Sequence, residues 1–526
     1  MIKHILAVCL LLAGTAGAQT LTDNQVKVDN GILQGSLESS AVHIFKGIPF
    51  AQPPVWDLRW RPPQPAKDWP GVRPATRFGP RAVQGSPASD TTIRTDQMGE
   101  DCLYLNVWTP AKTAEEHLPV LVWFYGGGFQ GGDGSEVRYD GESIAQRGIV
   151  YVTVNYRLGI FGFMAHPELT QESPHHSSGN YGLLDQHAAL KWVQTNIAAF
   201  GGDPKKVTIA GQSAGSLSVC AQMASPLSKD LISGAIGESG SVMGTLTPVP
   251  LQEAEKVGQQ FALKAGFKSL AELRAAPAEQ LYLAASKPRT RFPLTVDGYF
   301  FPADPAEIFK QGKQARIPLL VGWNSREGAY ESVLKDSPTV ENFEKAVKQL
   351  YPDNWQAVLK AYTPARTDRE AIIRSATDLA SDRFIGFSTW KWADIHCLTA
   401  KQPVYRYYYT WERAPLRKDL EKTGGTPPSP RTRYARHSAE IEYAWGNLDK
   451  TSAWAWTEED HKLSQAMEAY FANFIKTGNP NGKGLPNWPA IKPGEPSPFM
   501  RLDATPGAET EEHRDRYLLL DRIRSQ

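Results

Sequence analysis

The feature that most constrains this chain is the sequence Gly211-Gln212-Ser213-Ala214-Gly215. It follows the apolar run 207–210, which predicts a buried strand, and precedes a segment that we expect to be helical. The two flanking glycines allow a sharp turn, so the Ser213 hydroxyl would project above the sheet near a helix N-terminus. Such a sequence is common by chance, and a serine in an ordinary glycine turn is the alternative. The strand and helix on either side favour a nucleophilic serine.

Further apolar runs predict strands buried on both faces of a sheet, because they are short and end in turn residues. They are residues 119–125, 149–155 and 317–322. Between two of the predicted strands, apolar residues recur at helical spacing over residues 184–200. The order strand, helix, strand predicts an α/β fold with a mostly parallel central sheet flanked by helices.

Residues 26–28 and 32–37 predict two strands joined by a turn at Asp29-Asn30-Gly31, and we expect the sheet to begin with this pair. The stretches from about 242 to 316 and from 333 to 402 are mainly helical in pattern, which indicates helical, cap-like insertions on the sheet. We therefore expect residues 19–526 to form one domain with insertions.

A glycine triplet follows the predicted strand at 119–125, in the sequence Tyr125-Gly126-Gly127-Gly128-Phe129. Backbone N–H groups without neighbouring side chains can bind an oxyanion, and we assign Gly127, Gly128 and Ala214 as the donors. A flexible hinge or a phosphate-binding loop is the alternative, but no G-K-[ST] sequence follows.

The N-terminus has the layout of a secretory signal peptide: Lys3, an apolar run over residues 5–12, and the small residues Ala16-Gly17-Ala18. We expect cleavage after Ala18 and a secreted or periplasmic protein. A short N-terminal anchor is the alternative, but the run is well below the roughly 20 residues that span a bilayer.

The net charge of +1 and the absence of a long basic run argue against a nucleic-acid partner. Once the signal peptide and Cys9 are removed, Cys102, Cys220 and Cys397 remain, so at least one thiol is free. Their spacing matches no zinc pattern, and we expect no metal.

Several ordered segments resemble the type-B carboxylesterase and lipase family, which includes the cholinesterases, over nearly the whole mature chain. Besides the serine motif they are Phe45-Lys-Gly-Ile-Pro-Phe-Ala51, Glu100-Asp-Cys-Leu-Tyr-Leu-Asn-Val107, Asn155-Tyr-Arg-Leu-Gly159, Gly179-Asn-Tyr-Gly-Leu-Leu-Asp-Gln186 and His437-Ser-Ala-Glu-Ile-Glu-Tyr443. The resemblance implies the α/β-hydrolase fold and a bacterial-type carboxylesterase that acts on small-molecule esters without a cofactor.

The resemblance also implies site residues that spacing alone leaves open. Glu327, in Val321-Gly-Trp-Asn-Ser-Arg-Glu327-Gly328, looks like the acid of the family's Ser-His-Glu triad, and His437 looks like its histidine. The chain order of serine, acid and histidine is the one expected of this fold. Ser239 resembles the serine that hydrogen-bonds the acid. By the same comparison, Arg59 with Glu100 and Arg157 with Asp185 look like structural salt bridges.

The chain departs from the family at three places. Ala82 stands where many members have the cysteine that bridges the Cys102 equivalent, so that disulfide is absent. Gln212 replaces the glutamate that precedes the nucleophile in many relatives, and residues 85–99 contain no tryptophan. Both changes weaken the binding of quaternary ammonium groups, so we set a cholinesterase aside.

Residues 287–293 resemble the stretch in which the family builds its acyl pocket, and this stretch contains Arg289 and Arg291. We predict a basic pocket that accepts bulky or anionic acyl groups; arginines that merely hydrate the rim are the alternative. The function expected is serine ester hydrolysis. A lipase, a specialised esterase for feruloyl or toxin esters, and a catalytically dead adhesion module are the alternatives, the last of which requires a lost serine or histidine.

Overall fold

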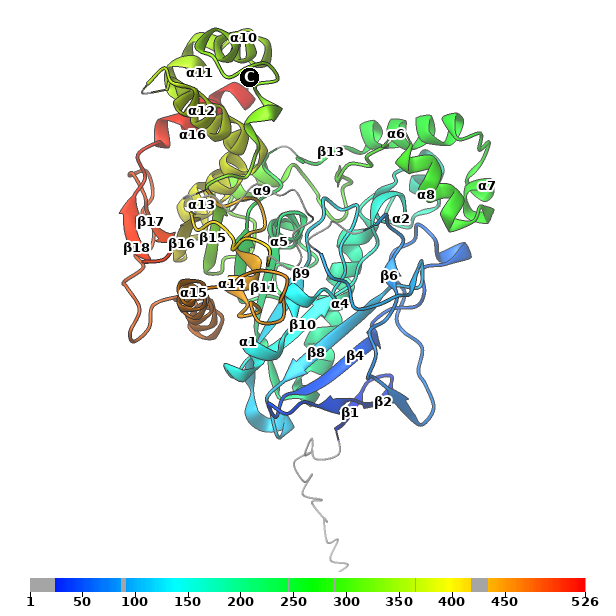
Figure 1. Cartoon of the computed structure of the whole chain (residues 1–526). Helices are drawn as coiled ribbons and strands as arrows, with labels where there is room; N and C mark the ends of the chain where they lie inside the picture. The colour runs from blue at the N-terminus through cyan, green and yellow to red at the C-terminus, as the bar shows by residue number, and fades with distance from the viewer. Residues whose placement is uncertain are drawn as a thin grey trace, which may run out of the picture.

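A computed structural model describes residues 24–86, 91–244, 246–287, 289–364, 366–417 and 434–525, and a single large sheet runs through it (Figure 1). The predicted signal peptide lies outside the described residues. The sheet has eleven strands in the spatial order β18 (Gly507–Thr510), β17 (Pro498–Leu502), β16 (Val404–Tyr409), β15 (Leu319–Asn324), β12 (Gly234–Glu238), β11 (Gly202–Gln212), β9 (Leu118–Phe124), β10 (Val150–Val154), β8 (Tyr104–Thr109), β4 (His43–Pro49) and β3 (Ser36–Leu37).

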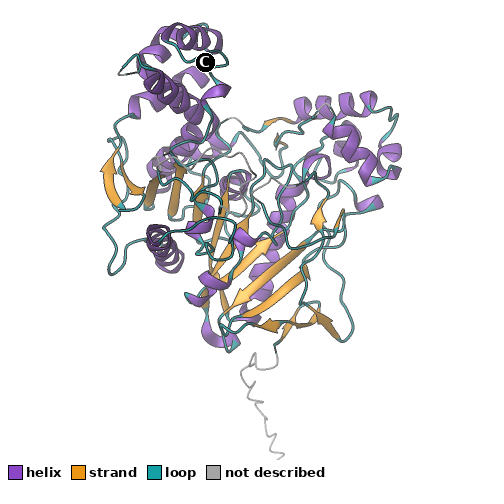
Figure 2. Cartoon of the chain, in the orientation of Figure 1, coloured by secondary structure: helices purple, strands orange, loops and turns teal. Residues whose placement is uncertain are grey.

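The centre of the sheet, from β10 to β17, is parallel, and the strands at both margins are antiparallel. Every residue of β10, β12 and β15 is buried, which explains why these strands are apolar without alternation. Helices cover both faces of the sheet (Figure 2). The fold is therefore the α/β-hydrolase fold, as the sequence predicts.

The predicted N-terminal hairpin exists, but the expectation that the main sheet begins with it is wrong. Strands β1 (Gln25–Val28) and β2 (Gly31–Gln34) pair antiparallel, and β2 pairs in parallel with β5 (Val72–Pro74) in a separate three-stranded sheet. The chain passes from one sheet to the other at Gly35. A Cβ there would lie 2.6 Å from the carbonyl oxygen of Ile44, so only glycine allows the main sheet to approach so closely.

The helix predicted over residues 184–200 is α4 (Tyr181–Asn196), followed by one turn of 3-10 helix at Ile197–Phe200. Helix α5 (Ala214–Ala224) follows β11 directly and is buried along its whole length, against β9, β11 and β12. This burial fixes the N-terminus of α5 relative to the ends of the parallel strands.

The two stretches predicted as insertions are mainly helical and form two groups beyond the strands, at the upper right and upper left of Figure 1. The first contains α6 (Leu251–Lys264), α7 (Leu270–Ala275) and α8 (Ala278–Ser286), whereas α9 (Pro305–Lys310), from the same stretch, lies near the centre of the picture and packs on α5 and α13. The second contains α10 (Val340–Leu350), α11 (Trp355–Tyr362), α12 (Arg369–Ser381), a π-helix at Asp382–Gly386 and α13 (Phe387–Ala400). The C-terminal helix α16 (Arg514–Arg524) packs on α11 and α13.

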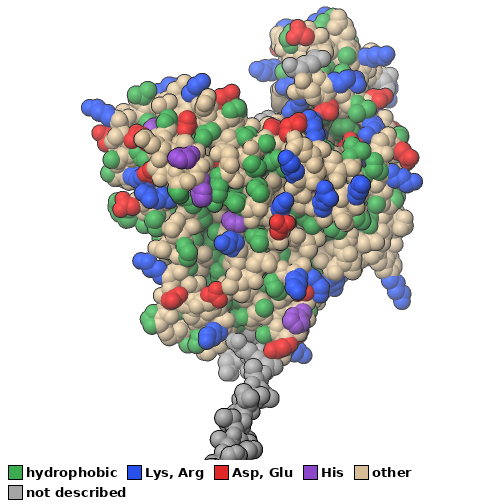
Figure 3. All heavy atoms as spheres, turned by 180° about the vertical axis from the view of Figure 1, so that it is seen from behind, with side chains coloured by type: hydrophobic (Ala, Val, Ile, Leu, Met, Phe, Trp, Pro, Cys, Tyr) green, Lys and Arg blue, Asp and Glu red, His purple; other side chains and the backbone are tan. Residues whose placement is uncertain are grey.

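On the face seen in Figure 3, positive and negative side chains are interspersed, in keeping with the net charge of +1. Among the described residues, no helix is long and apolar enough to cross a membrane.

Candidate active site

Ser213 occupies the sharp turn between β11 and α5 that its flanking glycines predict. Its backbone angles, φ 56° and ψ −121°, are rarely adopted by a residue other than glycine. The turn is held by the Ser213 N–H, which donates to the carbonyl of Glu238 at 2.8 Å. A Cβ at Gly215 would lie 1.9 Å from the carbonyl oxygen of Phe124, so glycine is required where α5 approaches β9.

Ser213, His437 and Glu327 form an unbroken chain of hydrogen bonds. His437 Nε2 lies 2.9 Å from Ser213 Oγ, and His437 Nδ1 lies 2.5 Å from Glu327 Oε2. Glu327 lies just after the end of β15. His437 lies much later in the chain, in a loop that brings its side chain against Glu327. The structure thus brings together Ser213, predicted from its local sequence, and the two residues assigned by resemblance.

The Glu327 carboxylate is buried, and its other oxygen, Oε1, also accepts hydrogen bonds. Ser239 Oγ and the N–H of Asn324 each donate to Glu327 Oε1 at 2.6 Å, so Ser239 makes the contact expected of it. Burial lowers the pKa of His437, but the adjacent Glu327 charge and hydrogen bond outweigh burial and raise the pKa above its usual value of 6.5. An imidazolium is thereby stabilised at this position.

Two further buried carboxyl groups, those of Glu440 and Glu238, lie close to the triad, and they were not predicted from the sequence. Burial, and then the charge of Glu327, raise the pKa of Glu440 to about 7. Burial, and then the charge of Glu440, raise the pKa of Glu238 well above its usual value. Both carboxyls therefore favour the neutral form beside the triad.

The N–H groups of Gly127, Gly128 and Ala214 surround the same cavity as Ser213. None of them donates a hydrogen bond to any residue that the structure describes. Gly127 and Gly128 have φ of 108° and 62°, a left-handed backbone that presents their N–H groups without a side chain in the way. These donors are free to bind a developing oxyanion.

The cavity above Ser213 has a volume of about 590 Å³. Gln212, buried at the base of the turn, and Arg291, at an exposed position, both line it. Arg289 does not: it lines an adjoining cavity of about 320 Å³ that shares Gln130, Tyr282 and Arg291 with the first. The structure therefore brings only one of the two predicted arginines to the catalytic cavity.

The π-helix is a wall of the cavity that sequence reasoning missed. It presents Phe384 and Ile385 to the cavity, and the Phe384 ring lies 5.4 Å from the His437 ring. Single π-helical turns within α-helices are often associated with functional sites. A π-helical turn contains one more residue than an α-helical turn, and the spacing of apolar residues in the sequence does not indicate it.

Glu136 and Arg138 also line the catalytic cavity and were not singled out from the sequence. They form an ion pair in which the side chains are 2% and 7% exposed. Nothing in the local sequence Gly134-Ser-Glu-Val-Arg138 distinguishes them from surface charges.

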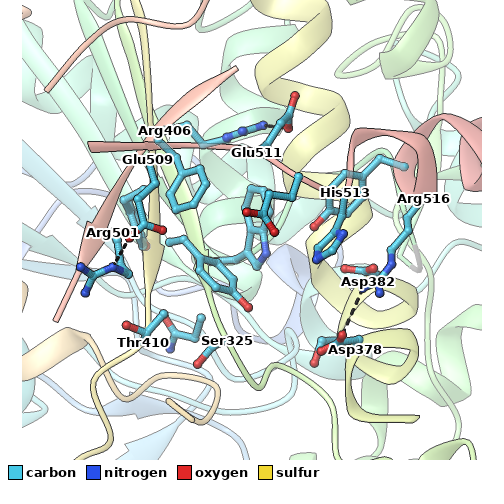
Figure 4. A pocket seen from close by; sticks show the side chains of 18 of the residues that line it. Ser325, Asp378, Asp382, Arg406, Thr410, Arg501, Glu509, Glu511, His513 and Arg516 are labelled. Carbon is cyan, nitrogen blue, oxygen red and sulfur yellow. Dashed lines mark hydrogen bonds and ion pairs between the residues drawn. The ribbon is translucent and has the colours of Figure 1, made fainter. Parts of the chain in front are cut away.

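A second cavity, of about 650 Å³, lies between the ends of β15, β16 and β17 and helices α12 and α16 (Figure 4). Its arginines are paired: Arg501 with Glu509 at 2.5 Å, Arg516 with Asp378 at 3.1 Å and Arg406 with Glu511 at 2.7 Å. Its two serines, Ser325 and Ser381, accept hydrogen bonds from the backbone N–H groups of Ala435 and Gly328.

The expected salt bridges are present: Arg59 and Glu100 at 2.6 Å, and Arg157 and Asp185 at 2.6 Å. Cys102, Cys220 and Cys397 are buried and free, in keeping with the expectation that at least one thiol is free. Within the described residues, no group of His, Cys, Asp and Glu side chains is placed to hold a metal.

Comparisons with known proteins agree with this geometry. A model of the carboxylesterase family matches residues 22–518. The chain is 36% identical over 482 residues to the fumonisin B1 esterase of Sphingopyxis macrogoltabida, covering 86% of this chain and 82% of that protein. It is also 36% identical over 551 residues to liver carboxylesterase 1 of Oryctolagus cuniculus, covering 95% and 93%. A solved structure of PNB esterase matches with a TM-score of 0.78 at 33% identity, covering 94% of this chain and 99% of that one.

The fold and the serine at its strand–helix turn define an α/β-hydrolase. With the matches above, the chain belongs to the carboxylesterase family and is a carboxylic ester hydrolase.

Proposed function

We propose that Ser213 is the nucleophile of this esterase, His437 the general base and acid, and Glu327 the carboxylate that orients the histidine. The observation that supports this most is the hydrogen-bond chain from Ser213 Oγ through His437 to Glu327, at 2.9 and 2.5 Å. Ser213 and His437 are both present and in contact, which argues against a non-catalytic adhesion module.

In the acylation step, Ser213 Oγ attacks the ester carbonyl carbon while its proton passes to His437 Nε2. The carbonyl oxygen becomes an oxyanion, which Gly127, Gly128 and Ala214 stabilise through their N–H groups. The bond to the alcohol oxygen then breaks, and His437 returns the proton to the leaving alcohol. In deacylation, water activated by His437 attacks the acyl-serine and releases the acid.

Ser239 and Gln212 have supporting roles in this proposal. The hydroxyl of Ser239 donates to Glu327 and keeps the carboxylate in place for the histidine. Gln212 precedes the nucleophile, is buried and lines the cavity, where its amide contacts bound substrate. Neither residue exchanges a proton with the ester.

A burst experiment tests the proposal. With p-nitrophenyl butyrate, the acyl-enzyme route releases p-nitrophenol in a rapid phase when deacylation is slow, and added methanol speeds turnover by intercepting the acyl group. His437→Ala should abolish both effects while the protein stays folded. A variant that lacks Ser213 or His437 and still turns over the ester at the wild-type rate contradicts the proposal.

For substrates, we propose small to medium carboxylic esters. A panel of aryl, acyl-glycerol and feruloyl esters, compared by kcat/KM, separates this from a lipase or a specialised feruloyl or toxin esterase. We also propose that residues 19–526 form one catalytic domain. In this proposal residues 1–18 are a signal peptide that directs the protein out of the cytoplasm and is cleaved after Ala18. N-terminal sequencing of the protein from its native cell tests that cleavage.

A further inference from the structure

Arg138 is a buried arginine on the wall of the catalytic cavity. It belongs to the 3-10 turn Val137–Tyr139, it is 6% exposed, and it lines the same cavity as Ser213 and His437. Its positive charge is close enough to His437 to disfavour the protonated imidazole. A buried cation so close to the reacting groups calls for an explanation, because burying a charge is costly.

The guanidinium of Arg138 is only partly used by the protein. Nε donates to Glu136 Oε1, and Nη2 lies 3.4 Å from Thr91 Oγ1. Nη1 makes no hydrogen bond to any described residue. The edge formed by Nη1 and Nη2 is therefore open for a ligand.

Two structural arginines, Arg157 and Arg59, differ from Arg138 on that point, whereas Arg94, which is paired with Asp140, also leaves one guanidinium nitrogen without a described partner. Arg157 uses Nε and Nη2 for Asp185 and Nη1 for the carbonyl of Arg61. Arg59 uses Nε and Nη2 for Glu100 and donates from Nη1 to three carbonyl oxygens. In both, every guanidinium nitrogen has a protein partner, which is what a purely structural ion pair requires.

Arg291 is an unpaired positive charge on the wall of the catalytic cavity. Apart from His437, the charged residues that line the cavity are Glu136, Arg138 and Arg291. Glu136 neutralises Arg138, and Arg291 makes no ion pair or hydrogen bond with any residue that the structure describes. Glu327 adds a buried negative charge behind His437, so the attraction for an anion is local to Arg291 and to the open edge of Arg138.

We propose that this esterase takes esters that bear a free carboxylate, and that Arg138 binds this carboxylate through its Nη1–Nη2 edge. The fork of an arginine matches a carboxylate through two hydrogen bonds, which a neutral ester cannot supply. Arg291 attracts the same charge from the exposed side of the cavity. The inference rests on the proposed function, since it concerns the substrate of the same site.

The test compares three substrates: p-nitrophenyl butyrate, p-nitrophenyl hemisuccinate and the butyrate ester of 4-hydroxybenzoate. The first is neutral, the second carries its carboxylate on the acyl side, and the third carries its carboxylate on the alcohol side. Assays are run above the pH at which His437 ionises, so that a change in its pKa does not alter the rate. If the wild type hydrolyses the neutral ester but hydrolyses neither carboxylate ester faster than the neutral one, the proposed function stands and the inference is overturned.

The key variant is Glu136→Gln/Arg138→Met, which removes the ion pair as a whole and leaves no lone buried charge. We expect kcat/KM to fall about 10- to 100-fold for at least one carboxylate ester, mostly through KM, and less than about threefold for the neutral ester. Arg138→Lys keeps the charge without the fork and should give an intermediate loss. Arg147→Met, which removes an ion-paired arginine outside the cavity, is the control.

Equal losses on all three esters, or none on any, overturn the inference, because Arg138 is then only a structural partner of Glu136. If the variants do not fold, inhibition of the wild type decides. Glutarate should inhibit hydrolysis of the neutral ester about tenfold more tightly than the neutral diamide of the same acid. Equal inhibition overturns the inference, whereas a wild type that hydrolyses no ester overturns the proposed function itself.

Discussion

The catalytic cavity and the second cavity are similar in size, about 590 and 650 Å³, and both lie where parallel strands end. They differ in how their polar groups are used. In the second cavity, Arg406, Arg501 and Arg516 each have a carboxylate partner, and these pairs bind the C-terminal segment to the sheet and to α12. In the catalytic cavity, backbone N–H groups and Arg291 have no described partner.

The difference teaches that unpaired backbone donors and an unpaired charge, and not volume, mark the reactive site. The arginines of the second cavity are all ion-paired, because an unpaired buried charge costs stability, although Asn324 Oδ1 and Tyr407 OH there have no hydrogen-bond partner among the described residues. Groups that bind a substrate or a transition state keep their capacity until the ligand arrives. The comparison predicts that substitutions in the first cavity alter rate and those in the second alter stability.

The largest effect is expected from Ser213→Ala. Loss of the nucleophile should lower kcat by about 10⁴-fold or more, because only binding and oxyanion stabilisation remain. Thermal unfolding should be unchanged, since the methyl group fits where the hydroxyl was. Thr410→Ala, in the second cavity, is the control and should stay within about threefold of wild type. Equal rates for the two variants would remove the distinction between the cavities.

Glu327→Gln should come next, with kcat lower by about 10² to 10⁴-fold, because an amide no longer fixes the tautomer of His437. The pH profile should also move. In wild type the rate rises with pH as His437 loses its proton, at an apparent pKa above 6.5 because Glu327 raises it. Without the charge of Glu327, the rise should occur at lower pH. A normal rate for this variant would mean that another carboxylate, such as Glu440, orients the histidine.

Arg406→Met should show the opposite behaviour. Arg406 is 3% exposed and paired with Glu511, so its loss leaves this buried carboxylate with Arg514 as its remaining ion-pair partner and should lower the free energy of unfolding by about 1–3 kcal/mol. Denaturant titration measures this. The kcat/KM per folded molecule should remain within about threefold of wild type, because the pair is not in the catalytic cavity. A rate loss without a stability loss would show that the second cavity acts on catalysis.

The smallest effect is expected from Glu440→Gln, and it concerns pH. Burial raises the pKa of Glu440 to about 7, so the folded state binds this proton more tightly than the unfolded chain does. Wild type therefore gains this stability fully below the ordinary carboxyl pKa of 4.5 and loses it as pH rises through about 7. Unfolding measured from acid to neutral pH should depend less on pH in the variant. An unaltered slope would show that folding does not shift the pKa of Glu440.

Local sequence predicted the features that depend on local pattern. The turn at Ser213 was predicted because its glycines and flanking strand are contiguous, and β9, β10, β11 and β15 because they are apolar runs. Glu327 and His437 needed the family resemblance, since 110 residues separate two side chains that touch.

What the sequence did not predict depends on contacts between distant segments. Strands β1 and β2 look like the start of the main sheet, but their partner β5 is selected by tertiary packing. Arg289 and Arg291 are two residues apart, yet Arg291 lines both the catalytic and the adjoining cavity and Arg289 lines only the adjoining one. Arg138 reaches the catalytic cavity only because its turn packs beside Asn447, far along the chain.

The central claim, that Ser213 forms the covalent intermediate, is tested most directly by labelling with a fluorophosphonate and mapping the modified peptide by mass spectrometry. The account predicts one equivalent of label, on Ser213, and none in Ser213→Ala. It also predicts slower labelling in His437→Ala, since the neutral imidazole activates the serine. Label on another residue, or equal labelling of Ser213→Ala, would contradict it.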